Sequence, residues 1–64
     1  MNATTDTIRS IEETHGVTIE VRHFGTDANL DARRGGRVVA MASVRGGLWA
    51  QALTTLTKRI EMEH

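Results

Sequence analysis

A length of 64 residues without a single cysteine leaves this chain few ways to fold. Such a chain has room for one hydrophobic core, so we predict a single domain over residues 1–64. A domain of this size buries only about 60% of the surface that its unfolded chain exposes, and no disulfide constrains the unfolded state. Stability is therefore expected to be marginal, and oligomerisation is the obvious remaining way to increase it.

Hydropathy and residue usage exclude several functional classes. No apolar run approaches the roughly 18 residues that a membrane span needs, and the first residues are polar and acidic. We therefore expect neither a membrane anchor nor a signal peptide. The lack of cysteine also removes thiolate zinc sites and cysteine nucleophiles. A reducing compartment is the default for such a chain, so we expect a cytoplasmic protein.

Alternating hydropathy predicts the clearest strand. Residues 17–23 place Val17, Ile19 and Val21 on one face and polar side chains on the other. Phe24 falls on the polar face. This indicates either a bulge that turns Phe24 inward or an outer face that is not wholly polar.

Two further segments have less regular patterns. Residues 29–33 form either a short strand or an irregular loop between two glycine-containing turns. Residues 37–44 carry apolar side chains at both parities, as a strand covered on both faces does. We therefore expect residues 37–44 to be the centre of the sheet.

Helical periodicity marks both ends of the chain. Residues 5–15 carry Ile8 and Ile11 three apart and end before Gly16, a typical helix stop. From residue 48 the period is helical again, and this second helix is expected to hold the core. Its apolar stripe consists of Trp49, Leu53, Leu56 and Ile60. A buried Trp49 implies that Trp49→Ala costs about 3–5 kcal/mol.

Short connections decide how these elements combine. No link between neighbouring strands is long enough for a crossover, so the strands pair antiparallel. The sequence predicts a two-layer α+β domain, in the order helix, strand, optional strand, strand, helix, with both helices on one face of a small antiparallel sheet. Nothing in the chain remains to cover the other face. Its apolar residues Phe24, Val39 and Met41 are the candidate interface for a homodimer or another protein.

The order of elements resembles that of two known families. With a middle strand, the layout resembles the double-stranded-RNA-binding domain, in which a lysine cluster at the start of the second helix grips phosphates. The corresponding residues 47–51 contain no lysine, so the RNA-binding role does not carry over. Residues 38–60 also resemble the strand-then-helix half of HicB-type antitoxins, where a similar fold binds a small protein toxin. That resemblance covers about a third of the chain and includes no diagnostic motif, so it assigns the chain to no family.

Residues able to carry catalysis are few and scattered. His15, His23 and His64 are the only side chains that titrate near neutrality, and none stands at metal-ligand spacing from another. Adjacent glutamates such as Glu12 and Glu13 are typical of a solvated helix face. We therefore predict no enzyme activity, no metal and no cofactor.

The net charge of zero conceals a strong segregation along the chain. Residues 1–31 carry a net charge of −4, residues 32–59 carry +6 and the last five residues carry −2. Seven of the eight basic residues are arginine, which suits phosphate and carboxylate. One interpretation is a basic patch for nucleic acid, built from Arg33, Arg34, Arg37 and Arg45. The alternative is internal pairing, in which the basic segment lies against the acidic one.

Arg-Gly-Gly occurs twice, at residues 34–36 and 45–47. Both copies are predicted to be tight turns. The second copy directly precedes a helix, so the backbone N–H groups of Gly46 and Gly47, with Arg45 beside them, form a candidate anion site.

Taken together, these patterns indicate a small non-catalytic binding module. We expect a regulator or inhibitor that acts by protein–protein contact as a homodimer. The alternative is a nucleic-acid-binding protein that uses the arginine patch.

Overall fold

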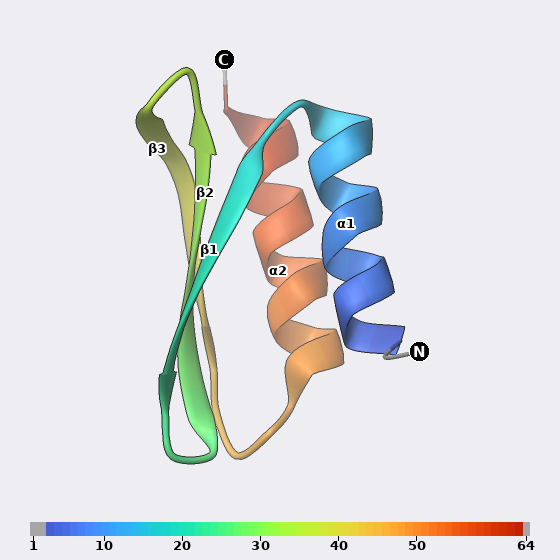
Figure 1. Cartoon of the computed structure of the whole chain (residues 1–64). Coiled ribbons are helices and arrows are strands. Elements are labelled where there is room, and N and C mark those ends of the chain that lie inside the picture. Colours follow the sequence, from blue (N-terminus) through green and yellow to red (C-terminus); the bar gives the residue numbers. More distant parts are fainter. Residues whose placement is uncertain (1–2, 64) are drawn as a thin grey trace.

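A computed structural model describes residues 3–63, which form a helix, three strands and a second helix in that order (Figure 1). The predicted α+β class, the antiparallel sheet and the element order are confirmed, and the uncertain middle segment is a full strand. His64, named above as a titratable side chain, lies outside the described residues. The elements are α1 (Ala3–His15), β1 (Thr18–Phe24), β2 (Asp27–Arg34), β3 (Arg37–Val44) and α2 (Trp49–Met62).

The first helix ends at the predicted glycine. Gly16 has a φ of 64°, in the left-handed region that favours glycine, and the Val17 N–H donates to the carbonyl of Glu12 at 3.2 Å. This bond satisfies one of the free carbonyls of the last helical turn. Val17 is buried, so the same turn anchors the start of the strand to the core.

The strand order is β1-β2-β3, so the prediction that residues 37–44 are the centre of the sheet is wrong. The middle strand is β2, and β3 is an edge. A bulge explains the misleading pattern: Ala32 pairs with Ala40 and Arg33 pairs with Val38, which leaves Val39 without a partner. The alternation shifts at this point. Apolar residues at both parities therefore reflect the bulge at Val39 and the exposed Met41, and not coverage on two faces.

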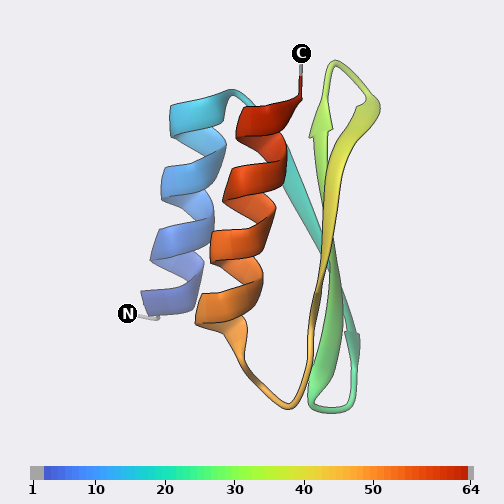
Figure 2. The same ribbon diagram turned by 180° about the vertical axis from the view of Figure 1, so that it is seen from behind.

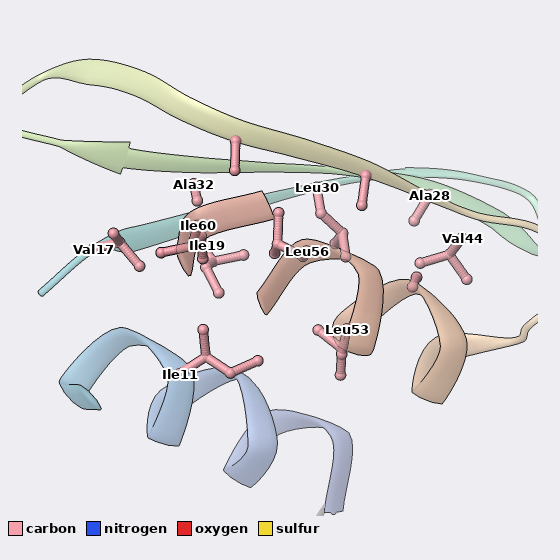
Figure 3. Packing of buried hydrophobic residues seen from close by; sticks show 13 residues of the cluster. Ile11, Val17, Ile19, Ala28, Leu30, Ala32, Val44, Leu53, Leu56 and Ile60 are labelled. Carbon is pink, nitrogen blue, oxygen red and sulfur yellow. The ribbon is translucent and has the colours of Figure 1, made fainter. Parts of the chain in front are cut away.

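Both helices lie on the same face of the sheet, with α2 against it and α1 alongside α2 (Figures 1 and 2). The inner face of the sheet is rich in alanine, whose short side chains let α2 approach closely. The predicted stripe of Leu53, Leu56 and Ile60 is buried here, and Ile11 joins it from α1 (Figure 3). The core also contains Val17, Ile19, Ala28, Leu30, Ala32, Ala40, Ala42, Val44 and Ala52.

Trp49 differs from the expectation of a buried residue. It is half-buried at the start of α2, where its ring lies 5.8 Å from the ring of His23 between centroids. We therefore expect Trp49→Ala to cost about 2 kcal/mol, below the usual cost for a fully buried tryptophan, because Trp49 packs against the core but keeps part of its side chain in contact with solvent. Thermal unfolding would measure this, and a loss above about 3 kcal/mol would contradict the half-buried placement.

In the described part of the chain, neither helix is long and apolar enough to cross a membrane.

Candidate interaction surface

The face of the sheet opposite the helices, here called the outer face, is not covered by any described element (Figures 1 and 2). Strand alternation and the pairing register decide which side chains it presents. Its residues are Thr18, Glu20, Arg22 and Phe24 from β1, Asp27, Asn29, Asp31 and Arg33 from β2, and Val38, Met41 and Ser43 from β3.

Diagonal ion pairs cross the outer face. Arg22 Nη2 lies 2.6 Å from Asp31 Oδ2, and Arg33 Nε lies 3.0 Å from Glu20 Oε2. The two pairs differ in burial: the Asp31 side chain is 8% exposed, whereas that of Glu20 is 55% exposed. Asp31 is thus a nearly buried carboxylate on the middle strand, whereas the side chain of its partner Arg22 is 61% exposed.

Apolar side chains stand among these charges. Phe24 is 60% exposed beside the β1–β2 turn, and Met41 is 58% exposed on β3. Phe24 therefore stays on the polar side of β1, and no bulge turns it inward. Val39 departs from the prediction, because the bulge leaves it half-buried against the core. Val38, two residues before Ala40, is exposed instead and pairs with Arg33 across the β2–β3 register.

The four arginines of the candidate nucleic-acid patch all have partners within the chain. Arg33 pairs with Glu20, and Arg34 Nη2 donates to the carbonyl of His15 at 2.9 Å. Arg34 thereby places a positive charge at the carboxyl end of α1, which the helix dipole favours.

The remaining two arginines join distant segments. Arg37 Nη2 lies 2.8 Å from Glu63 Oε1, and Arg45 Nη1 lies 3.7 Å from Asp27 Oδ2. Three of the four arginines are therefore paired with acids of the described chain, as in the alternative left open by the sequence, whereas Arg34 bonds to a neutral carbonyl. A phosphate backbone would have to compete with these partners for each arginine.

The candidate anion site at the second Arg-Gly-Gly turn is also occupied from within. The Gly46 N–H donates to Asp27 Oδ1 at 2.9 Å, and the Gly47 N–H donates to the carbonyl of Thr26 at 3.0 Å. Both glycines have positive φ, 56° and 74°, and their N–H groups go to two different acceptors of the β1–β2 turn. The carboxylate of Asp27 fills the place of an external anion and ties this turn to the β1–β2 turn.

Two charged side chains from the helices reach the open edges of the sheet. Glu12 Oε2 accepts a hydrogen bond from the Ile19 N–H at 2.8 Å, at the β1 edge. Arg59 Nη1 donates to the carbonyl of Met41 at 2.6 Å, at the β3 edge. Such charges limit association of each edge with a strand that carries the same charge. The sequence carried no signal for either contact, since each joins a helix to a strand only after the chain has folded.

A groove between the two helices is a further hollow, with a volume of about 390 Å³. Two of its threonines use their hydroxyls within the helices: Thr7 donates to the carbonyl of Ala3, and Thr57 donates to that of Leu53. Trp49 and Ile11 add apolar side chains to the lining. No observation indicates what this groove would hold.

Groups that could perform chemistry are dispersed. His15 ends α1, whereas His23 lies beside Trp49 at the far end of β1. Within residues 3–63, no group of three or more histidine, aspartate or glutamate side chains could hold a metal ion. The outer face and the β3 edge remain as the surfaces that could act. Comparison of the chain with protein-family models, curated proteins and solved structures finds no match.

Proposed function

We propose that this protein is a non-catalytic binding module that acts by protein–protein contact, with the outer face as the surface through which two copies form a homodimer. One observation carries the proposal: Phe24 and Met41 are more than half exposed on a face that no described helix covers. Burial of such apolar surface favours association.

The charges of the outer face support self-association. Each of its three acids has an arginine partner: Asp31 and Glu20 pair with Arg22 and Arg33 on the face, and Asp27 pairs with Arg45, which lies just beyond β3. A second copy related by a two-fold axis therefore meets no excess of like charge. The charges of the outer face therefore balance one another, as those of the whole chain do.

The size of the outer face limits the affinity. Three strands of about eight residues span roughly 14 by 26 Å in projection. That area is well below the roughly 800 Å² per partner of a standard interface. We therefore expect a weak homodimer with a Kd in the micromolar range, which a different protein could displace. Such exchange is how a module of this kind would act as a regulator or inhibitor.

Charge insertion at the outer face tests the homodimer. Phe24→Glu and Met41→Glu are each expected to raise the dimer Kd at least about tenfold, because each buries an unpaired carboxylate in the interface. Light scattering over a range of protein concentrations would measure the mass. Met62→Glu, at an exposed methionine on α2, is the matched control and should leave the mass unchanged. A wild-type chain that stays monomeric at millimolar concentration would overturn the proposal.

A further inference from the structure

The edge of β3 has backbone groups that face away from the sheet. The Met41 carbonyl accepts its hydrogen bond from Arg59, which lies on α2, and so it does not point toward β2. In an antiparallel ladder, alternate residues direct both N–H and C=O to the same side. Met41 and Ser43 therefore present their backbone groups at the open edge. An edge of this kind can accept another strand.

Two grooves flank this edge, and Arg59 lines both of them. The groove on the helix side has a volume of about 300 Å³, contains Arg45 and Arg59, and has no acidic residue in its described lining. The groove on the outer side has a volume of about 340 Å³ and adds Arg22, with Asp31 as its acid. Asp31 is already paired with Arg22. The surroundings of the β3 edge are therefore positive, most strongly on the helix side.

Of the arginines that line these grooves, Arg59 is the one whose charge is not offset by a described carboxylate. Among the described residues, no carboxylate lies within ion-pair distance of it, whereas Arg22 and Arg45 each have one. Its hydrogen bond goes to a neutral carbonyl. A guanidinium bonds more strongly to a carboxylate than to a neutral acceptor. An acidic group that reached this edge would therefore draw Arg59 away from Met41.

A second copy of this chain does not suit the β3 edge. Residues 37–44 contain no acid, and basic residues stand at both ends, Arg37 at the start and Arg45 directly after. Antiparallel pairing of two copies about Met41 would place Arg37 beside Arg45 of the other copy. Like charges in that position are unfavourable. The occupant is therefore a different chain that supplies the opposite charge.

We propose that the β3 edge binds an extended acidic segment of another protein as a fourth strand, and that Arg59 acts as its latch. An N–H of the incoming segment takes over the Met41 carbonyl, and the released Arg59 pairs with a carboxylate of the segment. Acidic side chains at alternate positions lie toward the helix-side groove. The other edge of the sheet is closed to such a segment, because Glu12 already places a carboxylate at Ile19.

This inference rests on the protein-binding role proposed above but not on the homodimer, since it uses the backbone of the edge and Arg59. The probe is a capped eight-residue peptide of alternating valine and glutamate, titrated at low salt while amide resonances are followed. We expect the largest shifts at Met41 and Ser43. The same peptide with lysine in place of glutamate should cause none. Absence of shifts with the acidic peptide, or equal shifts with both, would overturn the proposal.

Backbone pairing is tested by methylating every amide of the acidic peptide, which keeps its charge and removes its donors. Binding should be lost, and undiminished binding would show that charge alone is recognised and refute the added strand.

Variants test the latch. Arg59→Glu is expected to weaken binding of the acidic peptide at least about tenfold, because it sets two like charges together. Arg9→Glu, at an exposed position on α1, makes the same change of charge and should leave the Kd within about twofold. Equal losses in the two variants would refute a specific role for Arg59. Repeating the titration with Phe24→Glu separates the two proposals. This variant lacks the outer-face contact of the homodimer but keeps the β3 edge, so it should still bind the acidic peptide.

Discussion

Leu56→Ala is expected to destabilise the chain by about 3–4 kcal/mol, which is a large part of the total stability of a domain this small. Leu56 is 0% exposed and lies at the centre of the core, between α2 and the sheet (Figure 3). The sheet beneath it is lined largely by alanines, whose single methyl groups cannot extend into the vacated space. The cavity would therefore remain, and residual cavities add to the cost of truncation.

Urea unfolding, followed by the fluorescence of Trp49, would measure this loss as a lower transition midpoint. Leu48→Ala is the matched control, because it makes the same chemical change at an exposed leucine next to the start of α2. Its effect should stay within about 0.5 kcal/mol. Similar losses for the two leucines would contradict the arrangement of the core.

Arg22→Ala is the second large expected effect, at about 1–3 kcal/mol. The change removes the hydrogen-bonded partner 2.6 Å from Asp31, whose side chain is 8% exposed on the middle strand. A buried acceptor that loses its partner retains the cost of its lost hydration.

The same face provides the control for Arg22. Arg33→Ala breaks a diagonal pair of the same kind, but its partner Glu20 is 55% exposed and is hydrated after the change. We expect a loss of about 0.5 kcal/mol or less. The double variant Arg22→Ala with Asp31→Ala should recover part of the stability, because it removes the stranded carboxylate. Equal costs for the two arginines would show that burial of Asp31 does not matter.

Local patterns predicted much of the secondary structure. The alternation at residues 17–23 became β1, and Gly16 ended the first helix as expected. The helical period placed Leu53 and Leu56 in the core. These predictions succeed because hydropathy period and turn chemistry act over a few neighbouring residues.

The candidate site was harder to predict from the sequence than the secondary structure was. Phe24 and Met41 are exposed on the uncovered face, as the pattern indicated. Val39 is turned toward the core by a bulge, and a bulge depends on the register with β2. Trp49 is only half-buried, because the start of α2 lies at the margin of the core. The sequence placed Val39 on the uncovered face and Trp49 in the buried stripe of the second helix, because hydropathy alone could not indicate the bulge or how far the neighbouring elements extend.

The charge pattern shows most clearly what only the fold decides. The sequence by itself determined the α+β class, the antiparallel sheet, the uncovered face and the segregation of charge along the chain. It left open whether the arginines face a ligand or one another. The tertiary structure gives each of the four candidate arginines a hydrogen-bond or ion-pair partner within the chain. It also puts β3 at the edge of the sheet and brings Arg59 to that edge. Each of these contacts joins residues far apart in the chain, and no local preference specifies such pairs before the elements pack.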